Sequence, residues 1–248
     1  MAINYLKLND DKTEFIILGS SCNLAKVKTS SIQIGEHIIS KSDCVRNIGA
    51  LFDASMRMVE QVNQLSRTAW FHLHRISKIR QYLTTEQTQC IIHAYVTSRL
   101  DQNNSLLSGV PSTLLKKLQT IQNASAKVIV GRKKYDHVTE HLKELHWLPI
   151  SQRYVFKILL IVFKTLSGKG PDYIKDLLQS YEPSRKLRSS SEGLLTVPKT
   201  RCVSYGDRAF SVIAPKLWND IPLDIRESVS VESFKKKLKT HLFRISYL

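Results

Sequence analysis

The sequence predicts an α+β protein that is mainly α-helical, with a small β segment followed by a long helical region. The first observation is a change of hydrophobic period near residue 57, from short or alternating apolar runs to apolar residues spaced three or four apart. The second is the distribution of charge. Residues 1–60 hold 7 Lys/Arg and 7 Asp/Glu, residues 61–150 hold 12 and 5, and residues 151–248 hold 18 and 9. The whole basic excess therefore lies in the helical region.

The segment before residue 57 is expected to contain short strands. Residues 15–19 form an apolar run closed by a glycine, residues 31–38 alternate about Gly35 as a hairpin would, and residues 45–53 are a third candidate strand. Three short strands cannot easily form a core of their own. We therefore expect them to belong to a larger sheet.

Three helices are predicted between residues 57 and 131. The first has a polar face that carries Arg67, His74 and Lys78. Its apolar face is formed by Val62, Leu65, Ala69, Leu73, Ile76 and Leu83. The second carries Ile91, Ile92, Tyr95 and Val96, and the third carries Leu114, Leu118, Ile121, Ser125 and Val128.

Local signals define the ends of the second and third helices. Thr84 and Gln87 have the spacing of a capping box, which predicts a helix start. Pro111 stands where a first-turn proline belongs, and Gly131 is placed to end the third helix.

The remaining third of the chain is expected to be helical, apart from a long Ser-, Arg- and Lys-rich loop over residues 181–205. Residues 194–198 are a candidate strand within that loop. Helices are expected over residues 137–146, 152–167, 171–180, 206–220 and 230–245.

Composition narrows the class of protein. A formal charge of +16 attracts polyanions, of which nucleic acid is the commonest inside cells. The four cysteines form no CxxC pair, which favours a reducing compartment and argues against a zinc knuckle. No apolar stretch approaches the ~20 residues of a membrane span. We expect a soluble, intracellular protein, in cytoplasm or nucleus, with no membrane partner and no small-molecule substrate.

One motif matches an enzyme pattern. Residues 137–141 read HVTEH, from His137 to His141, which matches the HxxEH motif of a class of zinc hydrolases. Such a site needs a third ligand, and no downstream carboxylate stands in a recognisable ligand setting. We therefore interpret the match as chance and expect no metal site.

Basic clusters are the stronger signal. Two of them, Arg132-Lys133-Lys134 and Arg185-Lys186-x-Arg188, join Arg67 and Lys78 as the predicted nucleic-acid-binding residues. A third cluster, residues 235–239, is less specific because it can be the outer face of an amphipathic helix.

Several segments resemble a known family. LKLNDDKTEFIILG (6–19) resembles the LNxxKTE block of LINE-type reverse transcriptases, and CVRNIGALFD (44–53) resembles the VxxLGxxxD block that follows it. Later segments such as LHWLPISQRYVFKILLIVFKTLSG and YGDRAFSVIAPKLWNDIP resemble the C-terminal part of jockey- and chicken-repeat-like non-LTR retrotransposon elements.

The resemblance implies a division of the chain and a set of site residues. Residues 1–56 are then a palm remnant, residues 57–135 thumb-like helices, and residues 136–248 a basic C-terminal region. Lys12 matches the family's lysine after the catalytic YxDD block. The primer-grip turn corresponds to Val45, Asn47, Ile48 and Gly49.

The resemblance also implies a function. The parent enzyme is an RNA-directed DNA polymerase that uses Mg²⁺, but its metal-binding aspartates belong to motifs before those matched here. We therefore expect no cofactor and no polymerase activity from this chain alone. The expected capacity is binding of RNA or DNA, with the N-terminal half of the enzyme as a further expected partner. The alternative is a retrotransposon-derived pseudogene product without a nucleic-acid role.

Overall fold

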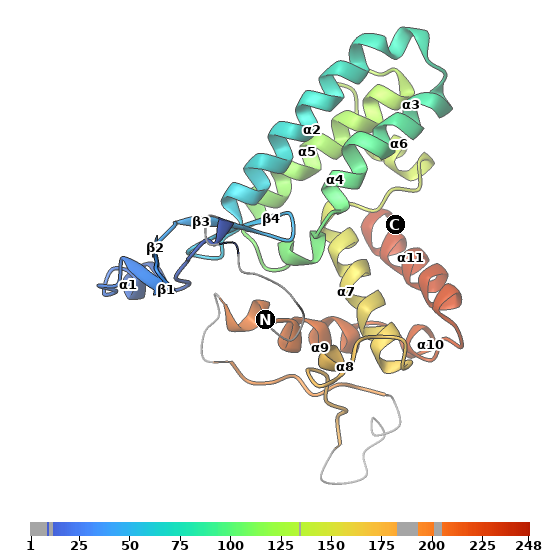
Figure 1. Ribbon diagram of the computed structural model, residues 1–248. Coiled ribbons are helices and arrows are strands. Elements are labelled where there is room, and N and C mark those ends of the chain that lie inside the picture. Colours follow the sequence, from blue (N-terminus) through green and yellow to red (C-terminus); the bar gives the residue numbers. More distant parts are fainter. Residues whose placement is uncertain (1–8, 10–11, 134, 183–192, 201–204) are drawn as a thin grey trace. The chain divides into compact units, whose positions relative to one another are not determined.

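The computed structural model describes residues 9, 12–133, 135–182, 193–200 and 205–248 (Figure 1). The protein is mainly helical, with two small antiparallel sheets of two strands each. Its contacts divide the chain into two units, residues 1–64 and 65–248, and the boundary falls inside a long helix. The predicted α+β, mainly α class is confirmed.

The first unit contains two β-hairpins. Its elements are α1 (Ser21–Leu24), β1 (Ser31–Ile34), β2 (His37–Ser40), β3 (Cys44–Asn47), β4 (Ala50–Asp53) and the start of α2 (Val59–Ile79). Strand β1 pairs with β2 across a turn at Gly35, which confirms the hairpin predicted for residues 31–38.

Two of the strand predictions need correction. Residues 45–53 are not one strand, because Ile48 and Gly49 (φ +46° and +79°) turn the chain between β3 and β4. Positive φ at both central residues is what a two-residue hairpin turn of type I′ requires. Residues 15–19 form no strand. Phe15 makes one isolated bridge with Lys41, because no neighbouring strand offers the segment a continuous ladder.

The side chain of Asp53 organises the start of α2. Its Oδ1 accepts hydrogen bonds from the Ser55 hydroxyl (2.7 Å) and the Arg57 N–H (2.9 Å), and its Oδ2 accepts from the Val59 N–H (3.3 Å). Burial alone would raise the pKa of Asp53, but these hydrogen bonds, with one from the Met58 backbone, outweigh it and lower the pKa.

The second unit is built from helices. After α2 come η3 (Arg80–Tyr82), α3 (Thr85–Ile92), η4 (His93–Thr97), α4 (Ser98–Asp101), η5 (Asn104–Leu107), α5 (Ser112–Val130), α6 (Thr139–Glu144) and α7 (Ile150–Leu166). The chain continues with α8 (Asp172–Lys175), η7 (Gly206–Arg208), α9 (Phe210–Asp220), α10 (Leu223–Arg226) and α11 (Val231–Tyr247). Helices from both sides of residue 135 share this unit, since α5 packs against α6 and α7.

The predicted apolar stripe of α2 is confirmed, with Leu65, Ala69, Leu73 and Ile76 buried in the second unit. The capping box of Thr84 and Gln87 is present, and Gly131 ends α5 in the left-handed conformation. Leu83 is an exception because it lies beyond the end of α2.

The second predicted helix is not a regular α-helix throughout. Residues 93–97 form a π-helical turn, η4, which is wider than an α turn. Tyr95 in this turn is 51% exposed, whereas Ile92, Val96 and Leu100 are buried.

The C-terminal helices enclose an aromatic core. Phe163 of α7 stacks on Phe234 of α11 with ring centroids 4.2 Å apart, and Trp218 of α9 lies 6.0 Å from Phe234. Asn219 holds the chain at Leu195 by hydrogen bonds in both directions, at 2.9 and 2.8 Å.

Two predicted helices of this region are shorter than expected. Helix α6 covers only Thr139–Glu144 of residues 137–146. Helix α8 ends at Lys175 because the following residues pair with the strand candidate instead, through a bridge between Ser180 and Leu195. In the part of the chain that the structure describes, no helix has the length and apolar character needed to cross a membrane.

Candidate nucleic-acid interface

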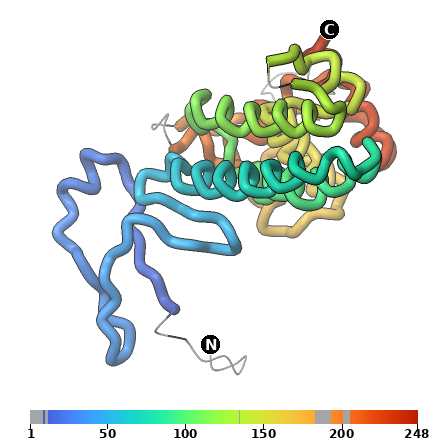
Figure 2. The backbone as a smooth tube through the Cα atoms, turned by 90° about the horizontal axis from the view of Figure 1, so that it is seen from above, coloured from blue at the N-terminus to red at the C-terminus, as the bar shows by residue number. Residues whose placement is uncertain are grey.

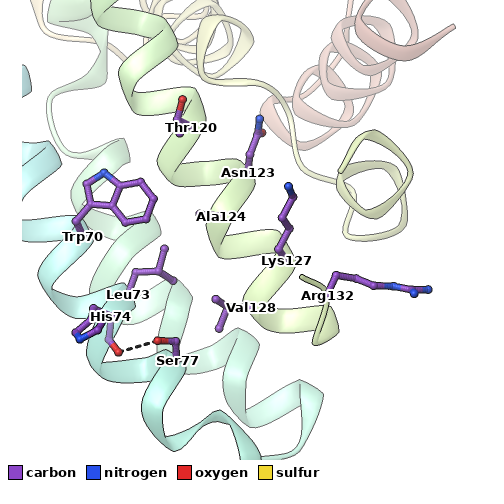
Figure 3. A pocket seen from close by; sticks show the side chains of 10 residues that line it. All are labelled: Trp70, Leu73, His74, Ser77, Thr120, Asn123, Ala124, Lys127, Val128 and Arg132. Carbon is purple, nitrogen blue, oxygen red and sulfur yellow. Dashed lines mark hydrogen bonds between the residues drawn. The ribbon is translucent and has the colours of Figure 1, made fainter. Parts of the chain in front are cut away.

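Helices α2 and α5 are long and run side by side (Figures 1 and 2). Residues of both helices line a groove. Its cavity volume is about 480 Å³, within the range of about 300–1,000 Å³ typical of ligand pockets. The residues that line it are Trp70, Leu73, His74 and Ser77 of α2, Thr120, Asn123, Ala124, Lys127 and Val128 of α5, and Arg132 beyond it (Figure 3).

The groove combines an aromatic wall with a basic rim. The indole of Trp70 forms one wall and is 42% exposed, while the buried Leu73 and the small Ala124 form the apolar floor. Lys127 and Arg132 stand at the rim on the α5 side (Figure 3). Such a groove offers a flat apolar contact beside positive charge.

A relay of amides fixes the direction of Asn123. The Ile150 N–H donates to Gln119 Oε1 (2.9 Å), and Gln119 Nε2 donates to Asn123 Oδ1 (2.8 Å). Because its oxygen is engaged, Asn123 offers its amino group to the groove. The hydroxyls of Ser77 and Thr120 donate to backbone carbonyls, so toward a ligand they act as acceptors.

The exposed face of α2 continues the pattern of aromatic and basic side chains. The guanidinium of Arg75 lies 4.7 Å from the ring centroid of Phe71, which is 53% exposed. The His72 ring lies 5.3 Å from that of Tyr95. Burial, then the positive charges of Arg99 and Arg75, lower the pKa of His72. The local field is therefore positive.

Carboxylates are nearly absent from this part of the chain. Residues 61–135 contain eleven Lys and Arg but only two acidic residues, Glu86 and Asp101. The carboxylate of Asp101 is paired with Arg153, whose Nη1 donates to both its oxygens at 2.9 and 2.7 Å. Basic residues therefore outnumber acidic ones in the segment that carries the α2–α5 face.

Arg80 fixes the end of α5 beneath the basic rim. Its Nε donates to the Val128 carbonyl and its Nη2 to the Ile129 carbonyl, both at 2.9 Å. Its Nη1 donates to the Leu83 carbonyl at 2.7 Å. A cation at a helix C-terminus satisfies carbonyls that lack a partner within the helix and complements the helix dipole.

Four of the predicted nucleic-acid-binding residues lie within the described residues, and all four are exposed. Arg67 and Lys78 are exposed on α2, on the side of the helix that also carries His74. Arg132 and Lys133 are exposed just after the end of α5. The other four predicted residues, Lys134, Arg185, Lys186 and Arg188, lie outside the described residues.

The residues expected from the family resemblance lie in the first unit. Lys12 is exposed, and its N–H contacts the carbonyl and side-chain oxygens of Asn9, both at 3.2 Å. Val45 and Asn47 lie in β3, and Ile48 and Gly49 form the turn that follows, with Ile48 88% exposed.

The HxxEH motif does not form a two-histidine helical face. His137 precedes α6, whereas His141 lies within it and pairs through Nδ1 with Glu144 Oε2 at 3.1 Å. Among the described residues, no three His, Cys, Asp or Glu side chains are grouped so that they could hold a metal ion.

The sequence reasoning missed Trp70, Asn123 and Lys127. The sequence did contain a signal for Trp70. It is a large aromatic residue that lies beside the apolar stripe of α2 and not within it, so that exposure was predictable. No sequence pattern singles out Asn123 or Lys127. Whether they line a groove depends on which helix packs beside α5.

No family model, curated protein or solved structure matches the chain. The candidate interface is therefore judged from its own chemistry.

Proposed function

We propose that the α2–α5 face binds nucleic acid through phosphate contacts that depend little on sequence. The observation that carries this proposal is the excess of basic over acidic residues in residues 61–135, which carry an exposed aromatic groove. Lys and Arg neutralise phosphates and release counterions, which favours binding of any sequence. Exposed aromatic rings beside such cations add stacking with bases.

The experiment is fluorescence anisotropy with unrelated RNA and DNA strands and duplexes at several salt concentrations. Five cations, Arg67, Lys78, Lys127, Arg132 and Lys133, give a slope of log K against log salt of about −3.5 for single strands and about −4.5 for duplexes. Replacing Arg67, Lys78 and Arg132 together with Gln is expected to flatten the slope by about 2–3 units and to weaken all sequences alike.

The matched control removes the same charge from α11, by replacing Lys235, Lys236 and Lys237 with Gln. Lys235 pairs with Glu232 at 2.7 Å, and Lys237 donates to the Asp224 carbonyl at 2.6 Å, so two of these ammonium groups have protein partners. We expect a much smaller change of slope. Equal effects of the two triple variants would assign binding to net charge rather than to the α2–α5 face.

A wider proposal concerns the origin of the chain. We propose that it corresponds to the C-terminal part of a non-LTR retrotransposon reverse transcriptase, supported by the LNDDKTE and VRNIGALFD segments and the long C-terminal motifs. Its partners are then RNA or DNA and the N-terminal half of that enzyme. If folded protein shows no salt-dependent binding at low salt, the alternative of a product without a nucleic-acid role is favoured.

A further inference from the structure

We infer that the groove between α2 and α5 takes one unpaired nucleobase of a single strand, stacked on Trp70, while the rim cations hold its phosphates. This inference rests on the proposed function and adds to it a preference for unpaired over duplex nucleic acid. Phosphate contacts alone, which any polyanion can satisfy, predict no such preference.

The shape of the groove supports a flat ligand. Trp70 exposes 42% of its surface, although the other two tryptophans, Trp147 and Trp218, are 4% and 3% exposed. In the floor, Ala124 contributes only a methyl group, which leaves space in the cavity (Figure 3). A planar base inserted there contacts the indole on one side and apolar side chains below. Stacking of a base on an aromatic ring favours binding and depends little on which base it is.

The polar groups around the floor suit a base edge rather than a second aromatic side chain. Asn123 presents its amino group because Gln119 occupies its oxygen. Such a donor suits the ring nitrogens and exocyclic carbonyl oxygens that act as acceptors on nucleobase edges. An apolar peptide side chain would leave this amino group without a partner, at a cost in free energy.

The position of the charges fits a strand rather than an isolated base. Lys127 and Arg132 stand on the α5 side of the groove, and Arg67 and Lys78 stand on α2. A strand that crosses the groove therefore has cations for its phosphates on both sides of the inserted base. A base pair in a duplex is closed to such insertion unless it is opened, which costs a few kcal/mol.

The fluorescence of Trp70 provides a direct test, because it is the exposed indole among the three. Unlabelled single strands of RNA and of DNA are expected to quench it, whereas a duplex of the same sequence is expected to bind with little quenching. A DNA strand of abasic sites, which keeps the phosphates and lacks the bases, is expected to bind by salt-dependent anisotropy without quenching. The RNA and DNA arms show which sugar the rim accepts.

Two variants test the groove without changing charge. Trp70→Ala removes the stacking wall and Ala124→Leu fills the floor. Each is expected to weaken single-strand binding roughly tenfold, which corresponds to about 1.4 kcal/mol, and to change duplex binding less than about twofold. Tyr173→Ala, at an exposed aromatic of α8, is the matched control and is expected to change neither.

The outcomes separate this inference from the proposed function. If strands, duplexes and abasic DNA bind equally and neither variant discriminates among them, the groove takes no base, although the phosphate interface stands. If the folded, unaltered protein shows no salt-dependent binding of any of these nucleic acids, both this inference and the proposed function are overturned. Because the abasic comparison uses the unaltered protein, a variant that fails to fold leaves the inference testable.

Discussion

Asp53 shows how much one side chain contributes to the start of a helix. It is the hydrogen-bond acceptor for several backbone N–H groups that precede or begin α2, and these donors favour its charged form. The same pattern cannot be supplied by an amide, which has one acceptor oxygen in place of two. The carboxylate therefore links the first unit's stability to pH.

Replacing Asp53 with Asn is expected to destabilise the first unit by about 1 kcal/mol at pH 7, as measured by chemical denaturation monitored within residues 1–64. Because the folded-state pKa is lowered, the carboxylate's contribution is present above the unfolded-state value near 3.9 and is lost as pH falls through the folded-state pKa. The difference between the two proteins should therefore shrink below about pH 4. A difference that stays constant down to pH 2 would contradict this account.

Gly109 and Gly131 form a natural matched pair, because both have φ near +70°. A Cβ at Gly131 would meet nothing, whereas a Cβ at Gly109 would collide with the Cγ of Arg208, whose Nε donates to the Ser108 carbonyl at 3.0 Å. Gly131→Ala is expected to cost about 1–2 kcal/mol from backbone strain alone. Gly109→Ala is expected to cost more, by the displacement of Arg208. Equal losses in thermal denaturation would show that Arg208 moves away without cost.

Among the helical elements, the ends of α2 and α5 are connected by the side chain of Arg80. Arg80 follows α2 directly and donates to the last carbonyls of α5, some fifty residues further along the chain. This contact fixes the end of α5 from which Arg132 extends. The groove between the two helices therefore depends on a residue that does not line it.

Replacing Arg80 with Met keeps an aliphatic stem and removes all its hydrogen bonds, and we expect a loss of about 2–3 kcal/mol in unfolding free energy. Arg75→Met is the control, because Arg75 is an exposed residue that contacts the ring of Phe71. Its loss should be within about 0.5 kcal/mol. If the two variants are equally stable in denaturant titrations, hydrogen bonds from water satisfy the carbonyls at the end of α5 as well as Arg80 does.

For the molecule as a whole, the two units differ in how much apolar surface they bury. Strands β1 and β2 contain no buried residue, and in β3 and β4 only Ala50 is buried. The second unit encloses a continuous core in which Phe234, Leu238 and Leu159 are inaccessible to solvent. Isolated two-stranded hairpins are marginally stable in water.

We therefore expect the backbone amides of the hairpin unit to exchange fastest in native-state hydrogen exchange. The comparison is between residues 15–18, which have one isolated bridge, and residues 158–163 in the middle of α7. Slower exchange at residues 15–18 would show that these edges pair with another chain, for which a concentration series is the control.

The sequence by itself determined the class of fold, most of the helices and several of their ends. These features depend on groups only a few residues apart, such as the Thr84–Gln87 capping box and the left-handed Gly131. The spacing of apolar residues also showed which side of α2 is buried, since that face repeats with the helical period. Four of the proposed binding residues followed from basic character alone.

Only the tertiary structure decided which helix covers each buried face, and so created the groove. Trp70 and Asn123 are more than fifty residues apart, and no local pattern indicates that they line the same cavity. The partners of Asp101 and Arg80 are likewise tertiary outcomes. The physical reason is that an apolar stripe demands burial but does not specify the surface that provides it.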